Sequence, residues 1–170
     1  MEPIILPPCK NPKVPQQTIP FRHRVDCQTR FNDFDIFGHL NNTIYMAFLD
    51  LGKATYYNDV LGNVFDFTKT TAVIVNVNVS FCSPTYMEEP LTVLTGCSRI
   101  SRHSFTLDQR VVNPLTGDVK CYASTVLAAF DAKTATGAEV PPEWVKAASD
   151  FENWPETPIF ASETPNNNEA

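Results

Sequence analysis

One segment with helical spacing, followed by four segments with strand spacing, is the feature that most constrains the fold of this chain. In residues 42–58, apolar side chains recur every three or four positions over a broad stripe, as in a helix covered on more than one side. Alternating segments follow at residues 73–81, 91–101, 103–112 and 119–130, with short turns between them. Sequential strands joined by short turns predict an antiparallel sheet, and the single long helix must cover one of its faces. The predicted fold class is therefore α+β.

Shorter signals complete this pattern on both sides of the helix. Residues 21–31 alternate between apolar and polar side chains over eleven positions, which predicts a half-buried first strand. Gly52 stands inside the helical segment, where glycine costs about 1 kcal/mol relative to alanine. We expect this cost to be offset by close approach of the helix backbone to the sheet. The run Pro141–Trp144 predicts the start of a short second helix.

The distribution of proline and apolar residues predicts three regions in a chain of 170 residues, a length that suits one domain. Residues 1–19 hold five of the 14 prolines and show no period, which predicts an irregular arm. Residues 20–154 carry the periodic segments and form the predicted domain. Residues 155–170 are rich in proline, asparagine and glutamate, which predicts a disordered tail.

Charge and cysteine usage disfavour several classes of function. The net charge is −6, whereas nucleic-acid binding usually requires a basic face, so we expect no nucleic-acid partner. The five cysteines contain no C-x-x-C pair and the three histidines show no metal-ligand spacing, so we predict reduced thiols and no metal site. No basic leader precedes an apolar stretch, and no apolar run approaches the ~18 residues of a membrane span. We therefore predict a cytoplasmic protein.

The most informative local motif is an acidic turn between the first strand and the long helix. It reads Asp33-Phe-Asp35-Ile-Phe-Gly38-His39-Leu-Asn41-Asn42. Two carboxylates stand two positions apart, a Gly-His turn follows, and a pair of asparagines precedes the helix, where asparagine is a favoured N-cap. This layout places a base or a nucleophile beside the positive end of a helix.

The motif resembles the D-x-D-x-x-G-H-x-N-N signature of hotdog-fold acyl-CoA thioesterases of the 4-hydroxybenzoyl-CoA thioesterase type, and the similarity extends over roughly residues 21–142. It implies the hotdog fold, in which an antiparallel five-stranded sheet wraps around one long central helix. It also implies hydrolysis of an acyl thioester. In that family the second aspartate of the pair is the nucleophile or general base, and this position is Asp35 here. The chemistry is coherent, because a carboxylate can activate water or attack directly, and a helix N-terminus can stabilise an oxyanion.

The resemblance implies roles for further residues, each with a plain structural alternative. His39 would orient the substrate carbonyl or Asp35. The predicted substrate-binding residues are Asn41, Asn42, Tyr45, Thr70 and Thr71, and the predicted CoA-binding residues are Arg99, Arg102, His103 and Ser104. The structural roles would be helix caps for the asparagines, core packing for the tyrosine and solvated charges for the arginines. Asp33 is predicted to be structural, pairing with Arg30 or accepting backbone N–H groups.

Several rival functions stay open from the sequence. The carrier of the acyl group is coenzyme A or an acyl carrier protein. A hotdog dehydratase or hydratase and a non-catalytic acyl-binding module are two further rivals. A serine-triad thioesterase is disfavoured because no G-x-S-x-G elbow is present. No cofactor is expected, because coenzyme A would be part of the substrate.

The same resemblance bears on assembly. The family is generally oligomeric, and the open edges of the predicted sheet need covering. Together these predict a homodimer or homotetramer with its acyl pocket shared between subunits.

Overall fold

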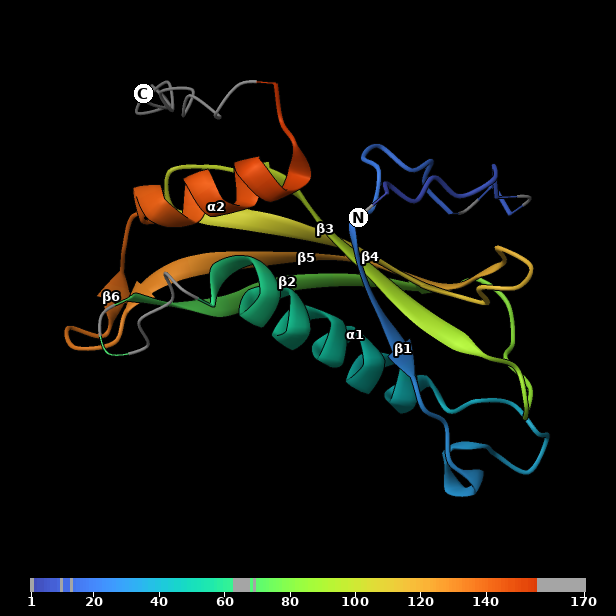
Figure 1. Cartoon of the computed structure of the whole chain (residues 1–170). Helices are drawn as coiled ribbons and strands as arrows, with labels where there is room; N and C mark the ends of the chain where they lie inside the picture. The colour runs from blue at the N-terminus through green and yellow to red at the C-terminus, as the bar shows by residue number, and fades with distance from the viewer. Residues whose placement is uncertain (1, 10, 13, 63–67, 69, 156–170) are drawn as a thin grey trace, which may run out of the picture.

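An antiparallel sheet with one long helix across its face dominates the computed structural model, which describes residues 2–9, 11–12, 14–62, 68 and 70–155 (Figure 1). The elements are β1 (His23–Cys27), η1 (Phe31–Asp33), α1 (Asn42–Tyr56), η2 (Tyr57–Leu61), β2 (Thr70–Phe81), β3 (Leu91–Ile100), β4 (Ser104–Val112), β5 (Val119–Asp131), β6 (Thr136–Gly137) and α2 (Pro142–Glu152). The five main strands lie in the order β1-β3-β4-β5-β2, and the short β6 pairs with β5. The predicted α+β hotdog fold is confirmed.

The helix α1 packs closely on the sheet at its glycine, as the sequence predicted. A Cβ atom on Gly52 would lie 2.7 Å from Nε2 of Gln109 and 2.8 Å from Oγ1 of Thr95. Gln109 is fully buried in β4, and its Nε2 donates to the carbonyl oxygen of Leu49 at 2.9 Å. The Gln109 side chain therefore hydrogen-bonds the helix backbone to the sheet, next to Gly52, where a larger residue would not fit.

The second helix, α2, covers part of a sheet edge that β1 leaves open. β1 pairs with β3 only from Leu91 to Thr95. Two residues further along β3, the Cys97 N–H donates to Oε1 of Glu152 at 2.8 Å, and the Tyr56 hydroxyl donates to the same oxygen at 2.7 Å. Glu152 thus supplies the acceptor that a neighbouring strand would otherwise provide.

Element boundaries differ from the sequence prediction at several points. The predicted strand 21–31 is too long, since β1 ends at Cys27, which pairs with Leu91, the first residue of β3. Pro90 comes before Leu91 and has no N–H, so the pairing cannot continue. The helix extends beyond the predicted residue 58 because a π-helical turn, η2, continues α1 to Leu61. The two-residue strand β6 was not predicted.

The N-terminal arm is partly ordered against the sheet. Ile4 forms an isolated antiparallel bridge with Phe21, with N–O distances of 2.7 Å and 3.0 Å. Val14 is buried in a cluster with Phe21 and Leu94. Apart from this bridge, the described residues of the arm form no helix or strand, and its apolar side chains pack against the sheet.

One prediction falls mainly outside the described residues. This is the tail at residues 155–170, of which only Pro155 is described. No helix within the described ranges has both the length and the apolar character that crossing a membrane requires.

Candidate active site

The acidic motif folds into a tight turn whose backbone holds the carboxylate of Asp35. Oδ1 of Asp35 accepts the N–H groups of Phe37 at 2.8 Å and His39 at 3.0 Å. The Asp35 N–H donates to the His39 carbonyl at 2.8 Å, and the Gly38 N–H donates to the Asp35 carbonyl at 3.0 Å. Gly38 has a φ of +74°, a conformation that glycine adopts without a steric penalty. The turn therefore fixes the carboxylate while leaving Asp35 exposed.

Asp33 stabilises the approach to this turn, as predicted for a structural residue. Its Oδ2 accepts the Arg30 N–H at 2.7 Å in a capping box around η1. Its carbonyl oxygen accepts both the backbone N–H and the side-chain amide of Asn41, at 2.9 Å and 2.8 Å. Asn41 occupies the N-cap position of α1, yet its side chain makes no capping hydrogen bond. The prediction of a side-chain cap from Asn41 is wrong, because Asp33 engages that amide instead.

A cavity of about 600 Å³ opens beside Asp35 at the N-terminus of α1. Its walls come from the acidic turn, the first turn of α1 and the end of β2. The lining residues are Asp35, His39, Leu40, Asn41, Asn42, Thr43, Tyr45, Phe81, Cys82, Ser83 and Pro84. Five of the predicted site residues thus lie together. The first N–H groups of an α-helix have no partner within the helix, so this wall can present donors to a ligand.

Tyr45 lies at the buried side of this cavity. It is 3% exposed, and its hydroxyl donates to Oγ1 of Thr85 at 2.8 Å. Its ring is 5.6 Å from the ring of Phe81, measured between centroids. Burial raises the pKa of Tyr45 above its ordinary value, although the Thr85 hydrogen bond opposes this shift. Tyr45 therefore lines the cavity as a neutral residue, and its hydroxyl is used in the hydrogen bond to Thr85.

His39 is held by neighbours on both sides of its ring. The ring centroid lies 5.2 Å from that of Tyr86 and 6.5 Å from that of Phe37. The backbone of His39 also forms an antiparallel bridge with Tyr86. The hydrogen bond from His39 to the Asp35 carboxylate comes from the backbone N–H, not from the imidazole.

The other predicted site residues lie at the opposite end of the sheet. Thr70 and Thr71 begin β2, whereas Phe81 ends it, and a strand of this length spans about 36 Å. Ser104 pairs with Ala128 of β5, and Ala128 pairs with Val73 of β2. The β3–β4 turn and the start of β2 therefore share one end of the sheet, away from Asp35 in the same chain.

The polar residues of the β3–β4 turn are engaged locally. Arg102 forms an ion pair with Glu139, and Nδ1 of His103 is 3.0 Å from the carbonyl oxygen of Ala138. The Ser104 and Ser101 hydroxyls are 2.8 Å apart. Arg99 and Arg102 are exposed. Within the described residues, no group of three or more potential metal-ligating side chains comes together.

Comparison with known proteins identifies the family of this chain. The model of the thioesterase-like superfamily matches residues 29–148, which is most of the chain and includes the acidic turn. The chain belongs to the thioesterase-like superfamily. Its enzyme class is thioester hydrolase, as the sequence predicted.

The individual proteins compared below share between 17% and 28% sequence identity with this chain. The chain is 28% identical over 105 residues to the long-chain acyl-CoA thioesterase FadM of Escherichia coli K12, covering 59% of this chain and 76% of that protein. A thioesterase from Thermus thermophilus, solved with coenzyme A and zinc, superposes with a TM-score of 0.68 at 20% identity, covering 80% and 98% of the two chains. A 1,4-dihydroxy-2-naphthoyl-CoA thioesterase from Synechocystis gives 0.65 at 17% identity, covering 75% and 95%. These two structures support the fold.

Sequence reasoning missed the residues that hold the far wall of the cavity. Thr85 accepts hydrogen bonds from the Leu40 N–H and the Tyr45 hydroxyl, at 2.9 Å and 2.8 Å. Lys120 and Glu89 form an ion pair behind it at 2.6 Å. The only available signal was a lysine near the start of a mostly apolar strand, and its partner lies far away in the chain.

Proposed function

We propose that this chain hydrolyses acyl-CoA thioesters, with the Asp35 carboxylate activating water or attacking the carbonyl directly. The observation that carries the proposal is the fixed position of Asp35 in the wall of the cavity at the α1 N-terminus. Backbone N–H groups occupy Oδ1, and Oδ2 has no hydrogen bond to the described residues. A carboxylate with one anchored and one available oxygen suits general-base or nucleophilic catalysis.

The α1 N-terminus provides the complementary half of the chemistry. Attack on a thioester carbonyl moves negative charge onto the carbonyl oxygen, and donors at a helix N-terminus stabilise such charge. Asn42 and Thr43 belong to the first turn and line the cavity. In the general-base route, Asp35 takes a proton from the attacking water, the tetrahedral species expels the thiolate, and the thiolate receives that proton. In the direct route, expulsion of the thiolate leaves a mixed anhydride on Asp35, which water then hydrolyses to the acid and free Asp35.

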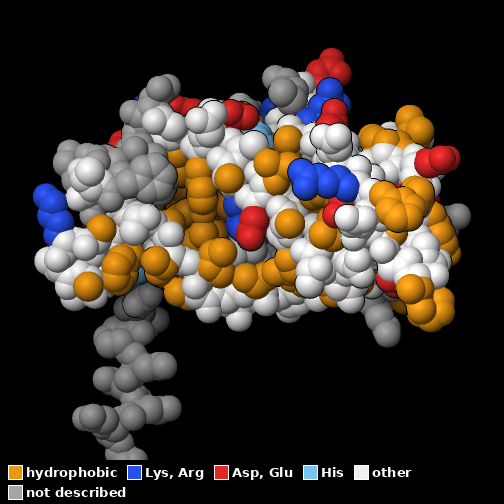
Figure 2. All heavy atoms as spheres, turned by 90° about the horizontal axis from the view of Figure 1, so that it is seen from below, with side chains coloured by type: hydrophobic (Ala, Val, Ile, Leu, Met, Phe, Trp, Pro, Cys, Tyr) orange, Lys and Arg blue, Asp and Glu red, His pale blue; other side chains and the backbone are white. Residues whose placement is uncertain are grey.

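We further propose that the active unit is a homodimer or a homotetramer. β2 is an edge strand with exposed Val73, Ile74 and Val75, at 37%, 49% and 58%. Figure 2 shows hydrophobic side chains exposed in patches over the α1 side of the molecule. Antiparallel pairing of two β2 strands about a two-fold axis would bring the Thr70 end of one copy to the Phe81 end of the other.

Such a dimer would unite the two groups of predicted residues. Thr70, Thr71 and the β3–β4 turn of one copy would face the Asp35 cavity of the other. Arg99 and Arg102 would then contact CoA phosphates, for which Arg102 exchanges its contact with Glu139. Light scattering and activity over one dilution series test this, and a fully active monomer at nanomolar concentration would rule it out.

Coenzyme A is favoured over an acyl carrier protein because the net charge of −6 disfavours docking of an acidic carrier. The hydratase and the non-catalytic binding module remain rivals without a specific observation in their favour. The cytoplasmic location and the absence of a cofactor also stay predictions.

The test is a panel of acyl-CoA substrates with thiol release as the signal, run on the wild type and Asp35→Asn. We expect Asp35→Asn to fold normally and to lose at least ~10²-fold in turnover, the usual scale for a positioned base. Asp33→Asn is the matched control, because it removes a charge two positions away and should cost more stability than turnover. Near wild-type turnover in Asp35→Asn would contradict the assignment.

A further inference from the structure

The loop between β2 and β3 contacts the acidic turn. Its Thr85 carbonyl accepts the Leu40 N–H at 2.9 Å, and its Tyr86 bridges to the backbone of His39. Ser83 and Pro84 of the same loop line the cavity that contains Asp35. The position of this loop therefore affects both the shape of the cavity and the placement of the turn.

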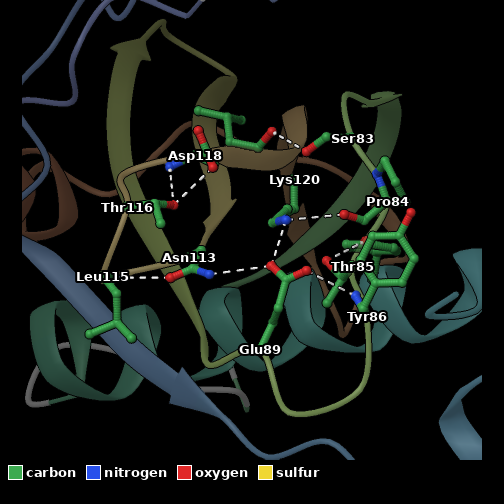
Figure 3. A network of polar contacts seen from close by, with 12 residues as sticks. Ser83, Pro84, Thr85, Tyr86, Glu89, Asn113, Leu115, Thr116, Asp118 and Lys120 are labelled. Atoms are coloured by element: carbon green, nitrogen blue, oxygen red, sulfur yellow. Dashed lines mark hydrogen bonds and ion pairs between the residues drawn. The ribbon is translucent and has the colours of Figure 1, made fainter. Parts of the chain in front are cut away.

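Lys120 holds the start of this loop through both its backbone and its side chain. Its carbonyl oxygen accepts the Cys82 N–H at 2.8 Å and the Ser83 N–H at 3.4 Å. Its Nζ donates to the Pro84 carbonyl at 3.0 Å and pairs with Oε2 of Glu89 at 2.6 Å (Figure 3). The Lys120 side chain is only 8% exposed, so this ammonium has little access to water.

Glu89 holds the other end of the loop. Its Oε1 accepts the Tyr86 N–H at 3.1 Å, and its Oε2 accepts Nδ2 of Asn113 at 3.2 Å, in addition to the Lys120 contact. Burial alone would raise the pKa of Glu89, but the hydrogen bonds from Lys120, Tyr86 and Asn113 lower it. The carboxylate is thus retained in its charged form.

The backbone between these anchor points is strained. Glu88 adopts a φ of 75°, which L-residues other than asparagine and aspartate rarely do. Such a conformation persists only when surrounding contacts determine it. The Glu89 carboxylate follows immediately and makes three of those contacts.

We propose that Lys120, acting with Glu89, is a positioning residue for the active site. The inference rests on the proposed function. Contacts run from Lys120 through Glu89 to Tyr86, then to His39, whose N–H holds the Asp35 carboxylate. A parallel path runs from Lys120 through Pro84 to Thr85, which anchors Leu40 and Tyr45. Loss of the ammonium allows the loop and the acidic turn to move together.

The test is Lys120→Met, which keeps most of the aliphatic length and removes the charge. Since small misplacements of a reacting group cost up to about 10²-fold in rate, we expect kcat to fall by roughly 10- to 100-fold. KM should change by less than about 3-fold, because Lys120 lies behind the cavity wall and loses no direct substrate contact. Lys120→Arg, which preserves charge and donors, should recover most of the lost kcat.

Lys146→Met is the matched control. Lys146 forms an ion pair with Asp150 at the same N–O distance, 2.6 Å, but the two side chains are 74% and 66% exposed on α2. We expect no change in kcat. This control distinguishes the general effect of losing an ion pair from the specific effect of losing the Lys120–Glu89 pair.

Glu89→Gln covers the case in which Lys120→Met does not fold. The amide oxygen can still accept the Tyr86 N–H, while the ion pair is lost, so kcat should again fall with KM nearly constant. A folded variant of either kind that retains kcat within about 2-fold of wild type overturns the inference, even if its melting temperature is lower. That result leaves the proposed function intact, because acyl-CoA turnover by wild type and its loss in Asp35→Asn test the function separately.

Discussion

At one end of the sheet, Asp35 stands exposed on a turn that is held by backbone hydrogen bonds and by the Lys120–Glu89 ion pair. At the other end, Trp144 of α2 is 2% exposed and packs edge-on against Phe105, with ring centroids 6.4 Å apart. Tyr56 and other apolar residues complete that cluster. Polar contacts thus hold the exposed turn at the first end, whereas α2 packs through a buried apolar cluster at the second.

The two ends also use a glutamate in opposite ways. Glu89 contacts a lysine ammonium, and its pKa is lowered despite partial burial. Glu152 is 6% exposed, and burial raises its pKa even though the Cys97 N–H, the Tyr56 hydroxyl and Arg22 act against the shift. The two pKa shifts indicate that the charged carboxylate is favoured beside Lys120 and disfavoured by burial at the apolar cluster.

The largest expected effect is on stability at the apolar end. Trp144→Ala should lower the free energy of unfolding by about 3–5 kcal/mol, the usual cost of truncating a buried aromatic residue. The kcat of the molecules that stay folded should be unchanged. Chemical denaturation combined with active-site titration measures both quantities.

Phe37→Ala serves as the control for this prediction. Phe37 is 75% exposed, so its loss should change stability by no more than about 0.5 kcal/mol. If Trp144→Ala reduced kcat as strongly as it reduced stability, the two ends would not be separable.

A smaller effect is expected at the turn that carries Asp35. Gly38→Ala places a Cβ in open space, with no atom within 4 Å, so the cost arises from the φ of +74° alone. We expect a loss of about 1–2 kcal/mol in the free energy of unfolding, together with a lower kcat. Denaturant titration and steady-state kinetics on the same preparation measure the two changes.

Gly137→Ala is the matched substitution at the other end. Gly137 likewise has no atom within 4 Å of its added Cβ, and its φ lies outside the left-handed region. Its stability should stay within about 0.5 kcal/mol of wild type. Equal losses at the two glycines would show that the turn geometry has no special role.

The smallest effect concerns pH. Glu152 has a raised pKa in the folded chain, so its contribution is fully present below the ordinary value of 4.5 and is lost as pH rises through the folded pKa. Glu89 has a lowered pKa, so its contribution is present above the ordinary value of 4.5 and is lost as pH falls through the folded pKa.

Denaturation curves between about pH 3 and pH 8 test this difference in sign. Relative to Glu152→Gln, wild type should become less stable as pH rises. Relative to Glu89→Gln, wild type should become more stable over the same change. Parallel curves for wild type and both variants would contradict the contrast between the two glutamates.

Much of the fold was predictable because the relevant signals are local. The side-chain period of two identified β2, β4 and β5 to within a few residues, and the helical period identified α1. The acidic turn was also predictable, since Asp35, Gly38 and His39 make their hydrogen bonds with one another inside a single short segment. The sequence alone therefore determined the long helix and the main strands, the fold class and the main catalytic candidate.

The remaining features depend on pairing between distant segments, which a local period does not encode. β1 ends at Cys27 because its partner strand begins after Pro90. Thr70 and Asp35 lie at opposite ends of the sheet because register, not proximity in the sequence, sets their separation. Lys120 reads as an isolated charge in a strand, and only the tertiary structure places Glu89 against it. Strand pairing joins residues that are far apart in the sequence, and the long loops between them can close in many ways. These contacts are therefore defined only by the tertiary structure.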